Sequence, residues 1–274
     1  MRSLSFFVLV FIILLYSCTG NTKSSETNIV ESTSPIPVIN YSVTGSFPHD
    51  TTLFTEGFLI YNGNLFESTG SPEELPQTRS VIGVIDLTTG KVDKKVELDK
   101  TKKYFGEGIV FLNNKLYQLT YKNQLGFIYD AKSFKQIGTF NYSNAEGWSL
   151  TANGTDLIMS DGTANLTFIS PDNLKPVKII TVRENGKLLE KVNELEYIKG
   201  FIYANVYQTN DIIKIDPSNG KVVGKLDLNS LALEAKYKNP NSDVLNGIAY
   251  DSAADKIYVT GKLWSIIYQI NFPH

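Results

Sequence analysis

The sequence predicts an all-β chain that folds as a five-bladed β-propeller. One short motif occurs five times, and its copies begin at Glu56, Glu107, Glu146, Asn193 and Asn246. Each copy joins an alternating strand to a second strand across a turn such as Asn62-Gly63, which is typical of a β-hairpin. Successive copies start about 40 to 50 residues apart, the length of one propeller blade. Five equivalent blades would bring the first residues of the motifs to one axis, so the repeat predicts a site together with a fold.

A second, weaker repeat supplies the outer two strands of each blade. Residues 85–92 and 215–222 are near copies, and residues 129–135 and 169–174 are looser ones. Each consists of a strand end, a turn rich in Pro, Ser, Asn or Gly, and the start of a new strand. The fifth unit ends near residue 271 without an outer strand. We expect the N-terminal segment 41–47 to supply it, because a ring closed by both chain ends leaves no exposed sheet edges.

Composition agrees with one compact β domain over residues 39–274. Aromatic residues make up 12% of the chain, and only residues 228–238 form a candidate helix. The formal net charge is −2 and there is no basic stripe, which gives nucleic-acid binding little electrostatic support. We therefore predict a monomeric propeller without a nucleic-acid partner.

The N-terminus predicts a secreted and anchored protein. Met1-Arg2-Ser3 is a short basic segment, and the apolar run 4–16 is too short to cross a bilayer, which indicates a signal peptide over residues 1–18. Its end, Leu-Tyr-Ser-Cys, resembles a bacterial lipobox in which Cys18 becomes the acylated first residue; the alternative is an incidental cysteine inside the signal. Residues 19–38 have the composition of a flexible tether. We expect a lipid anchor in a membrane of the bacterial cell envelope, with the domain facing the periplasm or the exterior.

The residue counts restrict the possible chemistry. The chain has two histidines, His49 and His274, and Cys18 is its only cysteine, so an ordinary zinc site cannot be assembled. A Ser-His-Asp triad would need His49, which we expect to be a solvated surface residue because it lies in a predicted turn. Any catalysis should rest on carboxylates, amides, Lys, Tyr and Trp. We expect no metal and no cofactor in the reaction, while a structural calcium ion stays open.

Five motifs, taken in order, carry a family resemblance. They are residues 104–109 (Tyr-Phe-Gly-Glu-Gly-Ile), 146–148 (Glu-Gly-Trp), 193–197 (Asn-Glu-Leu-Glu-Tyr), 244–251 (Val-Leu-Asn-Gly-Ile-Ala-Tyr-Asp) and 259–264 (Val-Thr-Gly-Lys-Leu-Trp). These motifs resemble the signatures of the glutamine cyclotransferases of plants and bacteria, and the similarity extends over about residues 41 to 271. The resemblance implies a metal-independent five-bladed propeller. It also implies glutaminyl-peptide cyclotransferase activity, in which the N-terminal glutamine of a peptide becomes pyroglutamate and ammonia is released.

That reaction requires one proton to move between two nitrogens. The α-amine of the substrate loses a proton as it attacks the side-chain amide carbon, and the departing ammonia gains one. A single carboxylate near both nitrogens can carry this proton if partial burial raises its pKa toward the working pH. Glu107 matches the general acid/base of the family; the alternative role for Glu107 is to cap a strand turn.

The resemblance implies supporting roles for further residues. Lys262 is expected to assist catalysis, either as a donor to the developing oxyanion or as the partner of an axial carboxylate. Alternatives remain open for the tryptophans, which could pack between blades, and for the asparagines, which could cap turns. The residues expected to bind the substrate are Phe54, Glu56, Phe105, Tyr121, Glu146, Trp148, Asn193, Tyr207, Asn246 and Trp264.

Three positions depart from the family pattern. Glu56 replaces a frequent glutamine, and a second acid near Glu107 would raise one of the two pKa values or bind the substrate ammonium group. Tyr121 and Tyr207 replace tryptophans, which keeps the aromatic wall but makes it smaller and adds a hydroxyl group. We expect turnover to survive and substrate preference to shift.

Two other functions stay open. A non-enzymatic propeller lipoprotein would bind a peptide, glycan or protein partner on the same face, because one fold hosts many functions. A propeller hydrolase or lactonase would need a central metal ion, for which the acids and amides of the repeated motif are possible ligands. The family resemblance argues against the metal-dependent hydrolase or lactonase.

Overall fold

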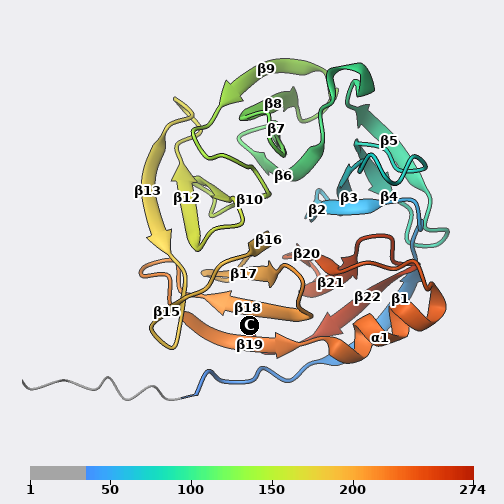
Figure 1. The fold of residues 1–274 in the computed structure, drawn as a ribbon, viewed down its shortest axis with the longest axis vertical. Coiled ribbons are helices and arrows are strands. Elements are labelled where there is room, and N and C mark those ends of the chain that lie inside the picture. The colour runs from blue at the N-terminus through green and yellow to red at the C-terminus, as the bar shows by residue number, and fades with distance from the viewer. Residues whose placement is uncertain (1–34) are drawn as a thin grey trace, which may run out of the picture. The chain divides into compact units, whose positions relative to one another are not determined.

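The computed structural model describes residues 35–274, which form five four-stranded antiparallel sheets around a central axis (Figure 1). The prediction of a five-bladed β-propeller is therefore confirmed. The first blade contains β2 (Phe54–Tyr61), β3 (Asn64–Gly70), β4 (Val81–Ile85) and β5 (Val92–Glu97). The second contains β6 (Gly106–Leu112), β7 (Lys115–Thr120), β8 (Leu125–Asp130) and β9 (Gln136–Asn141). The third contains β10 (Ser149–Ala152), β11 (Leu157–Ser160), β12 (Asn165–Ile169) and β13 (Pro176–Thr181).

The last two blades complete the ring. The fourth blade contains β16 (Val192–Ile198), β17 (Phe201–Val206), β18 (Asp211–Ile215) and β19 (Val222–Asp227). The fifth contains β20 (Leu245–Asp251), β21 (Lys256–Gly261), β22 (Ile266–Asn271) and the N-terminal strand β1 (Ser42–Pro48). Outside the blades lie a small hairpin, a 3-10 turn and one helix, namely β14 (Arg183–Glu184), β15 (Lys187–Leu188), η1 (Lys100–Lys102) and α1 (Asn229–Lys238).

Strand β1 closes the ring as the sequence predicts. It pairs antiparallel with β22, from Ser42 opposite Asn271 to Pro48 opposite Ile266. In Figure 1 the blue N-terminal strand therefore lies beside the red C-terminal one. Pairing across the chain ends satisfies the edge of the fifth sheet, which would otherwise offer its backbone groups to another chain.

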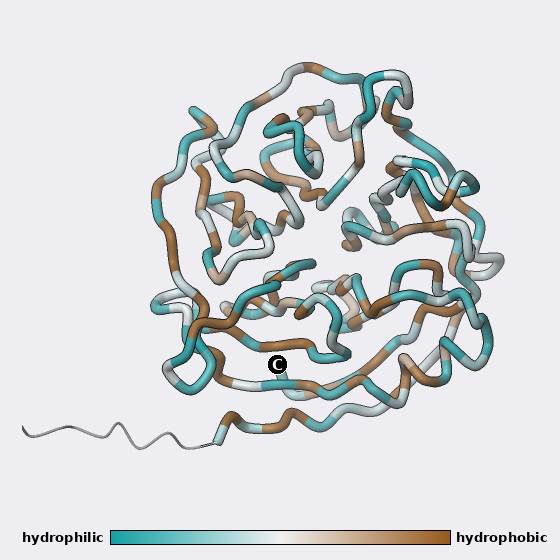
Figure 2. The backbone as a smooth tube through the Cα atoms, in the orientation of Figure 1, coloured by the Kyte–Doolittle hydropathy of each residue, from teal (hydrophilic) through white to brown (hydrophobic). Residues whose placement is uncertain are grey.

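The core lies between neighbouring blades. Figure 2 shows hydrophobic stretches along the strands and hydrophilic turns between them. The largest cluster joins Tyr203 of the fourth blade to Trp264 and Tyr268 of the fifth, all three fully buried. Burying one large apolar side chain contributes about 1.5–3 kcal/mol, so packing of this kind holds adjacent blades together.

The inner strands β2, β6, β10, β16 and β20 approach one another closely at the axis (Figure 1). A Cβ atom on Gly108 would lie 2.4 Å from the Cα atom of Ser149, which only a glycine permits. The pairing register of four inner strands shifts at one point, near Glu56, Glu107, Asn193 and Asn246. A bulge re-aims the side chain at that point, so the start of each of these strands can turn its side chain toward the axis.

The third blade differs in phase from the sequence prediction. Ser149 pairs with Ser160 in the third blade, as Gly57 pairs with Ser68 in the first. The Ser68 hydroxyl donates to the Glu107 carbonyl in the next blade, and the Ser160 hydroxyl donates to the Asn193 carbonyl in the same way. The residue equivalent to Glu56 in the third blade is therefore Trp148. The prediction that Glu146 begins this copy of the motif is wrong. A Cβ atom on Gly147 would meet the hydroxyl end of Tyr142 and not the next inner strand, so its match to the other glycines is coincidental.

His49 is buried, and the prediction of a solvated surface histidine is wrong. It directly follows β1, and its backbone N–H donates to the Ser265 carbonyl at 3.1 Å. The closing strand β1 thus places the His49 imidazole between the first and fifth blades. A turn position in the sequence indicates exposure only when no distant segment covers it.

The expected signal peptide and lipobox over residues 1–18 lie outside the described residues, as does most of the expected tether 19–38. Contacts with the propeller begin slightly before residue 39, because Val38 forms a parallel bridge with Lys225. Helix α1 lies where a helix is expected and buries Leu231 and Ala235. Within residues 35–274, no helix combines the length and the apolar character needed to span a membrane.

Candidate active site

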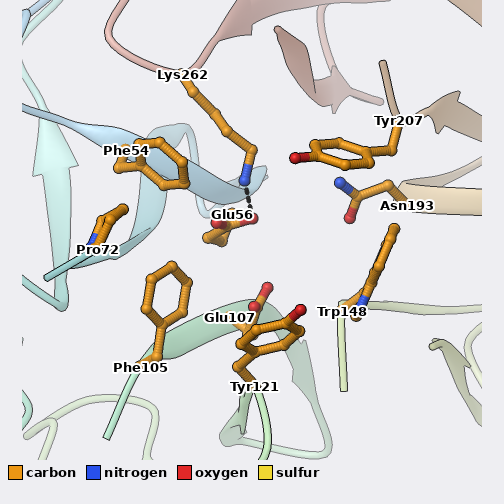
Figure 3. Close-up of a pocket in the computed structure, with 10 residues that line it drawn as sticks. All are labelled: Phe54, Glu56, Pro72, Phe105, Glu107, Tyr121, Trp148, Asn193, Tyr207 and Lys262. Carbon is orange, nitrogen blue, oxygen red and sulfur yellow. Dashed lines mark ion pairs between the residues drawn. The ribbon is translucent and has the colours of Figure 1, made fainter. Parts of the chain in front are cut away.

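A cavity of about 180 Å³ opens at one end of the central axis (Figure 3). Its walls come from the beginnings of inner strands and from the segments that follow second strands, which meet at the same end of each antiparallel hairpin. Segments from all five blades contribute. The lining residues are Phe54, Glu56, Pro72, Phe105, Glu107, Tyr121, Trp148, Asn193, Tyr207 and Lys262.

Two carboxyl groups and one ammonium group meet in the cavity. The Lys262 ammonium group forms an ion pair with the Glu56 carboxylate, and both side chains are buried. The Lys262 Nζ atom also lies 4.4 Å from the centre of the Phe54 ring, a cation–π contact. Of the two roles that the sequence left open for Lys262, the structure shows the pairing with an axial carboxylate.

The environment separates the roles of the two acids. Burial raises the pKa of Glu107 well above its usual range, and the neighbouring Glu56 carboxylate raises it further, while Lys262 opposes both. Burial also raises the pKa of Glu56, but the charge and hydrogen bond of Lys262 favour its ionised form. Lys262 therefore favours the anionic form of Glu56, while burial and the Glu56 charge favour the protonated form of Glu107, a group that can both hold and release a proton.

Aromatic rings form two facing walls (Figure 3). Phe54 and Phe105 meet edge to face with centroids 6.2 Å apart, and Phe105 continues to Tyr121 at 5.7 Å. On the other side Trp148 and Tyr207 meet edge to face at 5.5 Å. Such rigid walls can hold a short side chain folded back on itself.

Glycines set the positions of these walls. A Cβ atom on Gly70 would lie 2.1 Å from the Phe105 ring, so the ring can pack only against a glycine there. Gly162 has a φ of +79°, and a Cβ atom on it would lie 2.4 Å from the Trp148 ring. Gly70 is the last residue of the second strand β3 and Gly162 follows the second strand β11, and each leaves room for an aromatic side chain.

Asn193 offers hydrogen-bonding capacity to a bound molecule. Its side chain lines the cavity and is buried, yet its Oδ1 atom has no hydrogen-bond partner within residues 35–274. A buried acceptor without a partner costs about 1–3 kcal/mol. A ligand or solvent donor at this position would remove that cost.

Three of the residues expected in catalysis or binding lie outside the cavity lining. Trp264 is fully buried between blades, and its indole N–H donates to the Asp243 carbonyl at 2.8 Å. Asn246 is fully buried and donates to the Thr55 carbonyl at 2.9 Å. Glu146 accepts the indole N–H of Trp148 at 2.9 Å and so supports the wall from outside. The other predicted catalytic and binding residues line the cavity.

Two contributors were missed by the sequence reasoning. Pro72 lines the cavity from the loop after β3, where no repeated motif marks it. Glu194 is buried at the axis and accepts backbone N–H groups from Phe58 at 3.1 Å and Ile248 at 2.9 Å, which ties three blades together. Burial is the main cause that raises the pKa of Glu194 well above its usual range. The glutamate that replaces the usual glycine of the motif was the available signal.

The cavity is equipped for proton transfer at a small polar group. It holds one acid with a raised pKa, one buried ion pair and one amide oxygen without a hydrogen-bond partner, between aromatic walls. In the part of the chain that the structure describes, no group of three or more His, Cys, Asp or Glu side chains is placed to hold a metal ion.

Comparisons with known proteins agree on one family. A sequence model described as glutamine cyclotransferase matches residues 9–272. The chain is 37% identical over 258 residues to a glutaminyl-peptide cyclotransferase of Arabidopsis thaliana, covering 93% of this chain and 77% of the relative. The crystal structure of Myxococcus xanthus glutaminyl cyclase is similar with a TM-score of 0.77 and 32% identity, covering 87% of this chain and 98% of that one. The chain therefore belongs to the glutamine cyclotransferase family.

Proposed function

We propose that this protein is a glutaminyl-peptide cyclotransferase, an acyltransferase that converts the N-terminal glutamine of a peptide or protein to pyroglutamate and releases ammonia. The observation that carries the proposal is the position of Glu107, a buried acid with a raised pKa beside the Glu56–Lys262 ion pair in an aromatic cavity. A binding module has no need of such an acid.

We assign the proton transfer to Glu107, supported by its place in the cavity lining and its raised pKa. In its carboxylate form, Glu107 accepts the proton that the α-amine loses as its nitrogen bonds to the side-chain amide carbon. Glu107 then returns this proton to the amide nitrogen, the carbon–nitrogen bond breaks, and ammonia leaves. A pKa raised toward the working pH suits a group that acts first as a base and then as an acid.

The walls and the remaining polar groups position the substrate. Phe105 and Tyr121 face Trp148 and Tyr207 across the cavity, which favours the folded conformer of glutamine in which amine and amide carbon approach (Figure 3). The unpartnered Oδ1 atom of Asn193 can accept an N–H of the substrate. The Glu56–Lys262 pair keeps the negative charge next to Glu107 fixed.

Ammonia release tests the proposal. The purified domain without its leader is incubated with dipeptides that begin with glutamine, and ammonia and pyroglutamyl product are measured. We expect stoichiometric formation of both. Absence of product across several glutamine-initiated peptides would support the alternative, a propeller that binds a partner without turnover.

We expect chelators to leave this activity unchanged. The two histidines are already engaged, His49 with Glu67 and His274 with Asp255, and no thiol is available in residues 35–274. The rate of ammonia release should be the same with and without EDTA. A large loss that zinc restores would contradict the carboxylate mechanism. A change in melting temperature without a change in rate would indicate a structural calcium ion.

Glu56→Gln should move the acidic limb of the pH profile of kcat/KM to lower pH. Burial is the main cause of the raised pKa of Glu107, and the Glu56 charge is the next. Removing that charge leaves Lys262 unopposed, so the pKa of Glu107 falls and its carboxylate forms at lower pH. An unchanged or alkaline-shifted limb would show that another group produces it.

We also infer that the domain is tethered to a membrane of the cell envelope by lipid on Cys18. The support is the lipobox-like sequence at the end of the apolar run. Cys18→Ser should move the protein from the membrane fraction to the soluble fraction without changing the kcat of the domain. Unchanged membrane fractionation of the variant would contradict lipidation.

A further inference from the structure

A buried polar chain lies beside the cavity and contains none of its lining residues. His49 Nε2 lies 2.9 Å from Glu67 Oε2, and the two side chains are 0% and 1% exposed. Thr55 Oγ1 donates to the other Glu67 oxygen, Oε1, at 2.7 Å. The same hydroxyl lies 3.4 Å from the carbonyl oxygen of Gly261. The chain therefore runs from the closing strand into the first and fifth blades.

Both ring nitrogens of His49 face acceptors. Nε2 faces the Glu67 carboxylate, and Nδ1 lies 2.9 Å from the carbonyl oxygen of Trp264. Thr260 Oγ1 lies 3.4 Å from Nδ1, but it donates its own proton to the Ile266 carbonyl at 2.9 Å. A neutral imidazole has one N–H and would leave one buried acceptor unpaired. With Glu67 ionised, the arrangement favours an imidazolium ring that donates from both nitrogens.

The charges around the ring agree with this protonation state. Burial alone lowers the pKa of His49, but the charge and hydrogen bond of Glu67, together with the hydrogen bond to the Trp264 carbonyl, oppose burial, and the net result is a pKa above the usual value. The charge of Asp50, the next residue, also raises the pKa of His49. The imidazolium charge is therefore present below the raised pKa of His49 and is lost as the pH rises through it.

The chain ends at the residues that directly precede the catalytic ion pair. Thr55 precedes Glu56, and Gly261 precedes Lys262. A backbone bond from Leu263 N–H to the Leu53 carbonyl at 2.8 Å joins the same two segments. Any shift between them would separate the Glu56 carboxylate from the Lys262 ammonium group.

We propose that His49 and Glu67 form a positioning pair for the active site. Through Thr55 and the segment 261–264, the pair holds Glu56 against Lys262 and makes the geometry of the cavity depend on closure of the ring by β1. This inference rests on the proposed cyclotransferase function. It assigns no contact with the substrate to either residue.

Two substitutions at Thr55 test the link with the least disturbance. Thr55→Val keeps the shape of the side chain but removes the hydroxyl that binds Glu67, whereas Thr55→Ser keeps the hydroxyl. We expect Thr55→Val to lower kcat about tenfold with little change in KM, and Thr55→Ser to restore most of the loss, because the reacting groups are misplaced while the walls that bind substrate remain. Equal kcat values in the two variants and the wild type would overturn the proposal.

His274 provides a matched control for His49. Its Nε2 atom lies 3.0 Å from Asp255 and its Nδ1 atom 2.7 Å from the Phe272 carbonyl, the same pair of acceptor types away from the cavity. His49→Gln should lower kcat about tenfold or more, measured where each variant is fully folded, while His274→Gln should leave kcat unchanged. Equal losses of kcat in the two variants would mean that the effect comes from a general loss of stability, and this would overturn the positioning role.

Two readouts do not depend on activity. Long-range ¹H–¹⁵N spectra of the wild type at about pH 6.5, the usual pKa of histidine, should show protons on both ring nitrogens of most His49 side chains, and the signature of a predominantly neutral tautomer would overturn the ion pair. Crystal structures should show the Glu56–Lys262 contact broken in Thr55→Val and kept in Thr55→Ser. If the wild type released no ammonia from any glutamine peptide, the proposed function would fail, and these two readouts would still decide the positioning pair.

Discussion

Glu107→Gln is expected to lower kcat by about 10²–10⁴-fold, the contribution of general acid–base catalysis. Glutamine keeps the size and hydrogen bonding of the side chain but cannot carry the proton between the two nitrogens. Burial and Glu56 already favour the neutral form of Glu107, so a neutral amide should change the free energy of unfolding by less than about 1 kcal/mol. Steady-state kinetics on a glutamine dipeptide, with denaturant unfolding of the same samples, measure both quantities.

Glu196→Gln is the matched control for this experiment. Glu196 lies on the inner strand β16, burial raises its pKa to about 8, and it accepts the Tyr250 backbone N–H at 2.8 Å outside the cavity lining. The substitution removes a partly buried acid with a raised pKa without touching the proposed proton path, so kcat should stay within about threefold of the wild type. Glu146→Gln, beside Trp148, should also cost far less than Glu107→Gln. A fully active Glu107→Gln enzyme would remove Glu107 from the mechanism.

Lys262→Met is expected to be strongly destabilising, by about 3–5 kcal/mol, and to lower kcat as well. The substitution leaves the Glu56 carboxylate buried without its partner, and an uncompensated buried charge is costly. Glu56 would then take up a proton, and the fixed negative charge beside Glu107 would disappear. Denaturant unfolding measures the loss of stability, and kinetics on the folded fraction measure the loss of turnover.

A double variant separates the charge effect from packing. Lys262→Met with Glu56→Gln removes both charges and should recover most of the stability that Lys262→Met loses. Lys225→Met provides a surface comparison, since Lys225 pairs with Glu184 and Asp211 at partly exposed positions and should cost only about 0–1 kcal/mol. Failure of the double variant to recover stability would mean that the lysine stem, and not the charge, stabilises the site.

The repeats in the sequence determined the architecture. Hairpin signals at blade-length intervals predicted five sheets, and the segment 41–47 without a partner predicted the closing strand, which pairs as β1 with β22. Local turn chemistry and alternation specify a hairpin wherever it lies, so this information is present in short stretches of sequence. The same repeats, read with the family resemblance, placed most of the cavity residues, because equivalent positions in a closed ring converge on the axis.

Contacts between distant segments decided the rest. Trp148, and not Glu146, takes the axial position of the third blade, because a two-residue difference in where the strand pairs cannot be read from a motif. Trp264 and Asn246 belong to family motifs, yet both are fully buried and lie outside the cavity lining. His49 is buried against Glu67, and Lys262 pairs with Glu56, because the two ends of the chain close the ring beside the first blade. Burial and charge pairing depend on which groups lie nearby in three dimensions, and the ring brings together residues about 200 positions apart in the chain.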